Sequence, residues 1–317
     1  MDKVNRAYRV LKLYSKLIKG DGFNKKKMAD LFNVDEKTIE RDIIAIEEYM
    51  HDNDEMCDIK YIREEKGYFL SRKSKYFNKK DILAVIKILL ESRAFCKEEL
   101  EHLIDSILRQ ANMLQRKYIK ELIGNEEFNY IQLTKSKPLL EIIWQLSEFI
   151  IHKEIIIINY IKMNGDEVKR EVKPVGIIFS EYYFYLIGYY DDLDFPIVFR
   201  IDRIKKYEMK NEKYHIPYSK RFQDGEFKKR VQFMYSGKLI KIKFKFWGPS
   251  LDAVLDRLPT SEVIGYDGKK AVVKAEVFGK GILMWILSQR QFLEVLEPKE
   301  LREDVKKIIF EMNNIYR

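Results

Sequence analysis

The amino-acid sequence predicts a multidomain chain of the α+β class. Its length of 317 residues is enough for two or three domains, and its hydrophobic content of 46 % is enough to fill several cores. Helical periodicity dominates the first half, whereas short β-prone runs bounded by turn signals follow from about residue 155. We therefore expect four parts, at residues 1–72, 73–136, 137–218 and 219–317.

A helix-turn-helix is predicted in residues 1–72. Asp35 is a suitable N-cap for a helix because its carboxylate can accept backbone N–H groups of the first turn. One stripe of this helix is apolar at helical spacing and should be buried: Ile39, Ile43 and Ile46. The opposite face carries donors near its N-terminal half, where a recognition helix contacts bases and phosphates: Lys37, Thr38 and Arg41.

The flanking residues fit the same interpretation. A first helix is expected from an apolar stripe: Val4, Ala7, Tyr8, Leu11, Tyr14 and Ile18. A glycine-containing break at 20–22 precedes a short second helix at 26–32, and two β-prone runs at 59–62 and 67–70 surround a charged turn at 63–66. This order predicts a winged helix-turn-helix that reads double-stranded DNA. The expected contacts are Lys26, Lys37, Thr38, Arg41 and Arg63. The alternative is a small three-helix domain whose charged face is merely solvated.

Helical spacing continues through residues 73–136. Two helices, at 81–90 and 100–114, should form a connector that links or dimerises the chain. A further helix is expected at 139–151, with one face formed by Leu140, Ile143, Trp144 and Ser147.

The period then changes to that of β-strands. Strands are expected at 155–160 and 168–172, joined by a hairpin turn at Asn164-Gly165. Pro174 should open the next segment, with further strands at 183–188 and 197–201. Short strands at this spacing predict a small antiparallel barrel.

The last hundred residues predict a small α+β sandwich. Residues 240–246 alternate strictly, so the apolar side chains should face inward and Lys241, Lys243 and Lys245 outward. Helices are expected at 251–258, from 281 to 287 and at 301–316, with strands at 271–277 and 293–296. We interpret this part as a ferredoxin-like α+β domain.

Two strings in the barrel region resemble the WYL domain. They are Phe184-Tyr185-Leu186, in which phenylalanine replaces the tryptophan of the family, and Phe199-Arg200-Ile-Asp-Arg203. Tyr160 and Lys173-Pro174-Val-Gly176 match the family upstream of these strings, and Trp285 and Glu297-Pro298 resemble the C-terminal extension of WYL transcriptional regulators. Asp35 departs from the serine that is common at the recognition-helix cap. A carboxylate caps well but repels phosphate.

The resemblance implies an SH3-like or Sm-like barrel that senses a nucleotide or oligonucleotide effector. Carried over residue by residue, it implies a ligand site at Tyr160, Tyr185, Arg200 and Arg203. The side-chain chemistry agrees, because an arginine fork binds phosphate and stacks on bases, and tyrosine offers a stacking face. The alternative is that the two arginines pair with acids on the barrel surface: Asp192, Asp194 or Asp202. The pleat alone leaves open which face of 183–188 lines the core.

The net charge of +9 is concentrated in residues 203–246, where 14 Lys and Arg stand against 4 Asp and Glu. These lysines are either solvated on sheet faces or bind an anionic partner. The second possibility gives an alternative function, an accessory protein that binds single-stranded nucleic acid through the basic barrel. Duplex specificity would separate the two functions.

Catalytic and metal-binding patterns are missing from the sequence. The four histidines are scattered, and Cys57 and Cys96 lie far apart without a CxxC pattern, so we expect no enzyme, no metal site, no cofactor and no disulfide framework. The chain has neither an apolar stretch long enough for a membrane span nor a secretory signal at its start. We expect a cytoplasmic, homodimeric, ligand-responsive DNA-binding transcriptional regulator.

Overall fold

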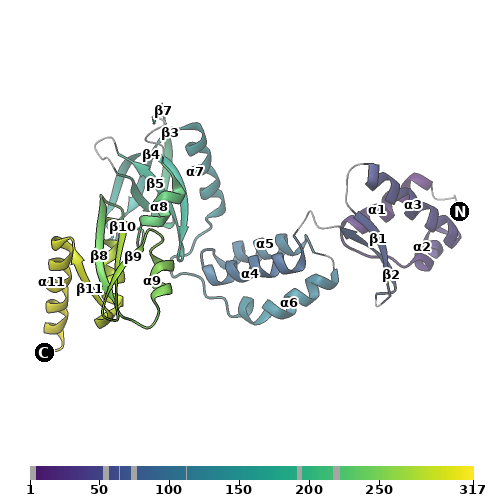
Figure 1. The fold of residues 1–317 in the computed structure, drawn as a ribbon. Coiled ribbons are helices and arrows are strands. Elements are labelled where there is room, and N and C mark those ends of the chain that lie inside the picture. Colours follow the sequence, from purple (N-terminus) through teal and green to yellow (C-terminus); the bar gives the residue numbers. More distant parts are fainter. Residues whose placement is uncertain are drawn as a thin grey trace. The chain divides into compact units, whose positions relative to one another are not determined.

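The computed structural model describes residues 5–52, 57–63, 65–72, 77–111, 113–190, 195–216 and 222–317. The chain divides into two compact units, Met1–Ser136 and Lys137–Arg317, and each is considered by itself. Figure 1 shows the ribbon with colours that follow the sequence and labels most of the elements. Within the described ranges, no helix combines the length and the apolar character needed to cross a bilayer.

The first unit begins with three helices and a hairpin. These elements are α1 (Arg6–Ile18), α2 (Lys25–Phe32), α3 (Glu36–Asp52), β1 (Cys57–Ile62) and β2 (Gly67–Arg72). Asn5 and Asn24 begin the first two helices by accepting hydrogen bonds from backbone N–H groups of the first turn, at 2.9 and 3.1 Å. The strands pair antiparallel with Ile62 opposite Gly67, so the expected hairpin is present.

The buried face of α1 differs from the expected stripe. Leu13 and Leu17 are buried, whereas Tyr8 and Leu11 are 57 % and 65 % exposed. Ala7 and Ile18 are also exposed, and Val4 lies outside the described residues. The prediction was wrong because α1 has apolar residues on two faces, and packing against α3 selects one of them.

The hairpin is anchored to the loop between α1 and α2. Phe23 and Tyr68 exchange two backbone hydrogen bonds, of 3.0 and 2.8 Å, and their rings stack. The Asn24 side-chain amide donates to the Lys66 carbonyl at 2.8 Å. Gly22 lies so close to the Phe69 ring that an added Cβ would be 2.1 Å from it. This loop therefore fixes the hairpin beside the helices.

Three helices follow in the rest of the unit. They are α4 (Lys79–Ser92), α5 (Lys97–Leu108) and α6 (Met113–Phe128). The second helix of the expected connector was drawn too long, because α5 ends at Leu108 and α6 was not foreseen. Helix α4 contacts both of its successors, and buried residues come from all three: Ile82, Ile86, Leu90, Leu100, Ile104, Leu108, Ile119 and Ile123.

The second unit begins with α7 (Leu140–His152) and a five-stranded antiparallel sheet. The strands are β3 (Glu154–Ile161), β4 (Glu167–Ser180), β5 (Tyr183–Tyr189), β6 (Ile197–Arg200) and β7 (Ile204–Lys213), in the order β6-β5-β4-β3-β7. Strand β4 continues through Pro174, contrary to the expectation that a new segment opens there. Its first half pairs with β3 and its second half with β5, with a register shift at Pro174.

This sheet must be rolled. Strands β6 and β7 lie at its opposite edges, yet only the 3₁₀ turn η1 (Ile201–Arg203) joins them. Four residue steps span at most about 14 Å, less than the roughly 19 Å width of five flat strands. The backbone N–H of Arg200 on β6 donates to the Tyr160 hydroxyl on β3 at 3.3 Å, which joins the two sides. The expected curvature of a small barrel is therefore present.

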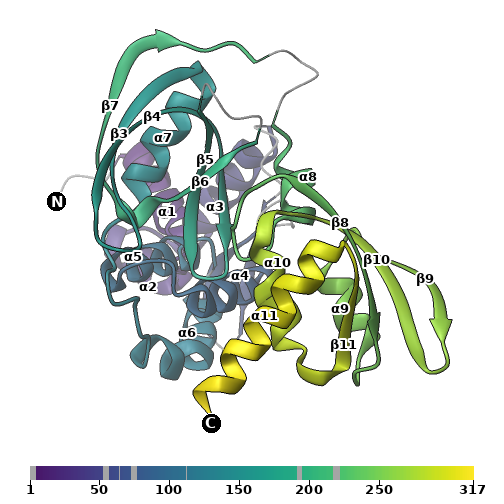
Figure 2. The ribbon, with the colours of Figure 1, turned by 90° about the vertical axis from the view of Figure 1, so that its left-hand side faces the viewer.

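Helix α7 packs against β3 and β4, as Figure 2 shows. Its buried residue is Leu146, whereas Trp144 is 64 % exposed. The predicted face of α7 was therefore right at Ile143, which packs against the sheet core, and wrong at Trp144. Ile142, Phe149 and Ile150 pack with Leu146 against the core of the sheet. Leu146 was not part of the face predicted from helical spacing.

The chain ends in a second sheet with helices. After α8 (Asp224–Arg230) come β8 (Leu239–Phe246), α9 (Leu251–Arg257), β9 (Glu262–Asp267), β10 (Lys270–Phe278), α10 (Ile282–Ser288), β11 (Leu293–Glu297) and α11 (Lys299–Ile315). The strand order β11-β8-β10-β9, antiparallel throughout, belongs to the split β-α-β arrangement. Elements α8 and β9 were not foreseen. Strand β9 is an edge strand whose outward positions include the apolar Ile264 and Tyr266, so its sequence lacks the alternation of polar and apolar residues that predicts a half-buried strand.

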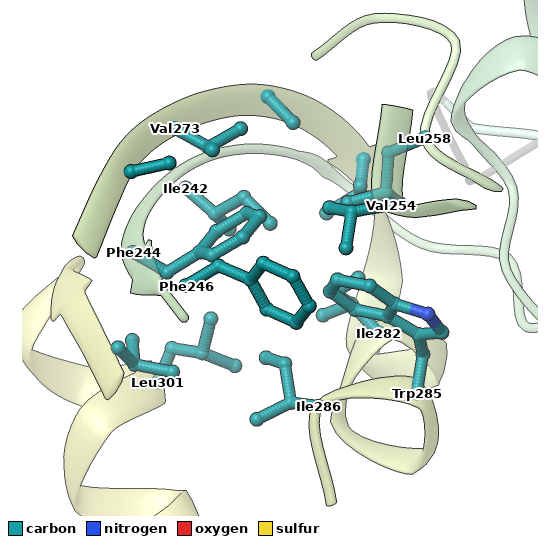
Figure 3. Close-up of a cluster of buried hydrophobic side chains, with 14 residues drawn as sticks. Ile242, Phe244, Phe246, Val254, Leu258, Val273, Ile282, Trp285, Ile286 and Leu301 are labelled. Atoms are coloured by element: carbon teal, nitrogen blue, oxygen red, sulfur yellow. The ribbon is translucent and has the colours of Figure 1, made fainter. Parts of the chain in front are cut away.

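The core of this sheet gathers on one face. Phe244 and Phe246 of β8 lie with Trp285 of α10 in one cluster, as Figure 3 shows. The rings of Phe244 and Trp285 meet edge to face at 5.7 Å. Val254 of α9 and Leu301 of α11 belong to the same cluster, so three helices cover this face. The outward face is left to the predicted lysines of β8.

Candidate functional site

A three-residue turn joins α2 to α3. Asn33 ends α2 in the left-handed conformation, with φ of 52°, and Asp35 begins α3. The Asp35 carboxylate accepts the Thr38 backbone N–H at 2.6 Å, so the predicted cap is present. Hydrogen bonds from the Thr38 side chain and then its backbone lower the pKa of Asp35 from its ordinary value.

The charges of α3 are separated onto two faces. Lys25 of α2 forms ion pairs with both Glu36, at 3.4 Å, and Glu40. Lys37 and Arg41 lie on the other side, exposed and without an ion pair to any residue that the structure describes. Ile44, one turn beyond Arg41, is 51 % exposed on this face. This face therefore presents two cations without an ion pair among the described residues, together with one apolar side chain.

The buried face of α3 contains an ion pair that sequence reasoning missed. The Arg9 guanidinium on α1 donates to both oxygens of Asp42, whose side chain is 1 % exposed. Arg6 adds a third contact to this carboxylate, at 3.6 Å. Asp42 directly follows Arg41, so one residue step separates an outward cation from an inward anion. The pair joins α1 to α3 and fixes the rotation of α3 about its axis.

The other predicted contacts of this segment also lie on its surface. Thr38 is half-buried next to the cap, and Lys26 is exposed in the first turn of α2. Arg63 is exposed directly after β1, where its carbonyl accepts the Lys66 backbone N–H at 3.2 Å. Neither Lys26 nor Arg63 has an ion pair within the described ranges. None of the four predicted cations of this segment therefore forms an ion pair with a residue that the structure describes.

Arg200 is the centre of the aromatic cluster on the rolled sheet. Its guanidinium lies 3.4 Å from the centre of the Tyr183 ring. It also donates to both oxygens of Asp202, at 3.1 and 2.6 Å. The alternative of pairing with a surface acid therefore applies to Arg200, through Asp202, while Asp192 and Asp194 lie outside the described residues.

The two predicted tyrosines lie on either side of this arginine. Tyr160 accepts the Arg200 backbone N–H and packs edge to face on Phe199, so its ring belongs to the core. Tyr185 is directly opposite Arg200 on the neighbouring strand. Burial raises the pKa of Tyr185 to about 12. Tyr185 therefore stays protonated near neutral pH and can donate a hydrogen bond.

The packing also identifies the faces of β5. Phe184 and Leu186 point into the core under α7, whereas Tyr185 and Ile187 pack on the other side, against Phe227 and its neighbours. Arg203, in η1, is half-buried and has no hydrogen bond or ion pair to any described residue. Tyr185 and Arg200 therefore lie opposite each other on β5 and β6, whereas Tyr160 contacts only the backbone of Arg200 and its ring lies in the core on the α7 side. Of the two predicted arginines, Arg203 alone has all its donors unused among the described residues.

The basic tract is largely neutralised where it forms strands. On β8, Lys241, Lys243 and Lys245 pair with Glu276, Glu297 and Asp267 at 3.8, 3.7 and 2.7 Å. On β7, Lys205 and Lys210 pair with Glu167 and Glu171 of β4, at 2.6 and 2.8 Å. These five lysines are therefore compensated by acids of the sheets to which they belong.

Metal chemistry finds no support in the described ranges, where no three His, Cys, Asp or Glu side chains are placed to hold an ion. Cys96 is a free, buried thiol at the start of α5, and burial raises its pKa, which makes it a poor nucleophile. The side chain of Cys57 lies outside the described residues.

Comparison with known proteins identifies one domain of the chain. A search of the curated proteins finds no match to the chain. Proteasome accessory factor B/C (PafBC) of Arthrobacter aurescens is similar at 15 % identity and a TM-score of 0.34, over 95 % of this chain and 47 % of that one. The chain thus spans about half the length of that protein. A CRISPR Cas-related protein is similar at 13 % identity and a TM-score of 0.37, over 77 % and 75 % of the two chains.

With TM-scores below 0.5, these two likenesses support no inference about function. The family model is more informative, because residues 141–209 match the WYL domain. The matched range begins in α7 and ends in β7, so it contains the rolled sheet and the whole cluster around Arg200. The chain therefore contains a WYL domain.

Proposed function

We propose that this protein is a DNA-binding transcriptional regulator whose first three helices and hairpin form a winged helix-turn-helix. The observation that carries the proposal is the divided charge of α3. Lys25 neutralises Glu36 and Glu40, while Lys37 and Arg41 stay free on an exposed face. The WYL domain and the resemblance of the chain to WYL regulators agree with this function.

In this proposal α3 lies in the major groove of duplex DNA. Arg41 contacts a guanine edge or a phosphate, Lys37 and Thr38 contact the backbone, and Ile44 contacts a thymine methyl group. Lys26 and the N-terminus of α2 hold a neighbouring phosphate, since helix N-termini present free N–H groups. Arg63 reaches the backbone from the hairpin. Base contacts supply specificity, and phosphate contacts supply most of the affinity.

Internal contacts prepare this surface before DNA binds. The buried pair of Arg9 and Asp42 sets the rotation of α3, and the bonds between Phe23 and Tyr68 hold the hairpin. Fewer groups then have to be ordered on binding, which favours affinity. We infer that the DNA-binding surface is rigid. Regulation would then act by changing the distance between the two winged helix-turn-helix segments of a homodimer.

The WYL domain is the proposed sensor of a nucleotide or oligonucleotide effector. Tyr160, Tyr185, Arg200 and Arg203 remain the proposed site. Because Arg200 is paired with Asp202, an effector phosphate would use Arg203 and the remaining N–H groups of Arg200. Exchange of the Asp202 contact for a phosphate contact is a physical route by which the effector can alter η1. No catalytic role is proposed.

The direct test is fluorescence anisotropy on the duplex upstream of the protein's own gene, compared with scrambled duplex and single strand across a salt series. Replacement Arg41→Ala should weaken specific binding by about 1 to 3 kcal/mol. Lys12→Ala is the matched control, because Lys12 is an exposed cation of the same segment outside α3. Equal affinity of Arg41→Ala and the wild type would reject this docking. Tighter binding to single strands would favour the accessory-protein alternative.

A further inference from the structure

A second candidate site lies between the rolled sheet and the C-terminal sheet, away from Arg203 in sequence. An open hollow of about 230 Å³ is lined by the end of β4, the turn after α8 and the end of α9. Its apolar wall includes Phe179, Phe233 and Met234, and its polar groups include Lys228, Gln232 and Arg257. A second hollow of about 360 Å³ shares Phe233 and Arg257 with it.

Arg257 is incompletely satisfied at this position. Its Nε–H is buried and has no hydrogen-bond acceptor. The guanidinium lies 4.8 Å from the centre of the Phe233 ring, and one terminal nitrogen is 3.7 Å from a Glu181 oxygen, beyond hydrogen-bonding distance. The side chain as a whole is 37 % exposed, and its terminal N–H groups also have no hydrogen bond to a described residue, so these groups can be reached by an oxygen-bearing ligand.

The charge around the first hollow is positive. Lys228 and Arg257 line it, and no acid is among its lining residues. Lys229 and Arg230, which follow Lys228, both pair with Glu226, but Lys228 has no ion pair within the described ranges. Lys228 is thus a cation of the basic tract at 203–246 that forms no ion pair with a neighbouring acid among the described residues.

The turn that closes the hollow has an unusual backbone. Phe233 and Met234 both have positive φ, of 49° and 54°, and lie between the bridge partners Gln232 and Tyr235. Two-residue turns of this kind normally contain glycine, asparagine or aspartate, because larger side chains are strained there. The strained turn presents both side chains to the hollow, and strain of this kind concentrates at ligand sites.

We infer that this hollow binds a small organic anion, in which a carboxylate or phosphate is attached to a planar apolar body. The anionic group would accept from the terminal N–H groups of Arg257 and attract Lys228, and the body would stack on Phe233. Glu181 is the competing anion, so binding releases its contact with Arg257. The site joins two parts of the second unit and does not depend on the proposed DNA binding.

Isothermal titration calorimetry on the full chain tests this inference, with phenyl phosphate and benzoate as anionic probes and benzyl alcohol as the neutral analogue. At least one anion should bind with one-to-one stoichiometry, and at least tenfold more tightly than benzyl alcohol. The two anions distinguish phosphate from carboxylate ligands. Absence of binding by both anions, or equal binding of the alcohol, would overturn the inference.

Variants locate the binding at Arg257. Arg257→Gln should weaken the preferred anion at least tenfold, Arg257→Lys less, and Lys228→Gln several-fold. Lys229→Gln is the control, since Lys229 is paired outside the hollow and should leave affinity unchanged. Thermal unfolding confirms that each variant is folded, and Arg257→Lys retains the charge if Arg257→Gln does not fold. Unchanged affinity in both folded Arg257 variants would contradict the assignment.

Discussion

Helix α3 and strand β8 both carry regularly spaced cations on an exposed face, but their surroundings differ. On β8 each lysine meets an acid: Glu276 is opposite Lys241, Glu297 is opposite Lys243, and Asp267 contacts Lys245. On α3, Lys25 pairs with Glu36 and Glu40, and neither Lys37 nor Arg41 forms an ion pair with a described residue. Positive charge in a sequence therefore indicates a nucleic-acid surface only where the fold leaves it uncompensated.

The largest effect should come from the buried charge behind α3. Asp42→Asn leaves the Arg9 guanidinium buried without its anion, and should lower the free energy of unfolding of this segment by about 3 to 5 kcal/mol. Lys243→Gln, which removes an exposed pair, should cost no more than about 1 kcal/mol. Hydrogen exchange of the α1 and α3 amides in increasing denaturant measures both.

Removing both charges of the buried pair distinguishes the cost of an unpaired charge from a loss of packing. If the buried charge is responsible, combining Arg9→Met with Asp42→Leu should recover most of the stability lost in Asp42→Asn. Similar small losses for Asp42→Asn and Lys243→Gln would mean that the two pairs are equivalent. The contrast between buried and exposed charge would then fail.

Salt dependence of DNA binding compares α3 with β8 directly. Lys37→Ala should remove one phosphate contact, so the slope of log affinity against log salt should become shallower by about 0.9. The triple replacement of Lys241, Lys243 and Lys245 by Gln should leave that slope unchanged, because those charges are already paired. A shallower slope in the triple variant alone would transfer the nucleic-acid surface to β8.

Features that depend only on residues close in sequence were predicted correctly. The stripe of α3, the Asp35 cap and the alternation of β8 each follow from residues close in sequence, and all three are present. The Asn164-Gly165 turn also joins its two strands as expected, with Gly165 at φ of 92°. Such features need no knowledge of the rest of the chain.

Features that depend on distant partners could not be predicted. The inward face of α1 includes Arg9, which is buried only because Asp42 lies opposite it, 33 positions along the chain. Strand β9 exists through its pairing with β10. Pro174 is accommodated within β4 because the strand changes partner there.

The candidate sites also divide into features set by nearby residues, which were predictable, and features set by distant partners, which were not. The outward positions of Lys37 and Arg41 were predictable from helical spacing and are exposed in the structure, whereas Thr38 is half-buried. The choice between Asp192, Asp194 and Asp202 as the partner of Arg200 was open, since it depends on how η1 turns. The hollow at Arg257 combines β4, the strained turn and α9, and no local motif marks it.

The smallest predicted effect concerns Asp35, the acid beside the free cations of α3. Its pKa is lowered from 3.8 in the folded chain, first by the hydrogen bond from the Thr38 side chain and next by that from the Thr38 backbone. Its capping is therefore fully present above pH 3.8 and is lost as the pH falls through the lower folded value. Amide exchange in the first turn of α3 should accelerate in that acidic range.

Two replacements distinguish the cap from the charge. Asp35→Ser should retain the cap without this acid transition, and Asp35→Ala should expose the first turn at every pH. Because a carboxylate repels phosphate, Asp35→Ser should also bind duplex DNA slightly more tightly than the wild type. An acid transition that persists in Asp35→Ser would assign it to another group. Weaker DNA binding by that variant would show that the carboxylate orients Lys37 and Arg41 rather than opposing them.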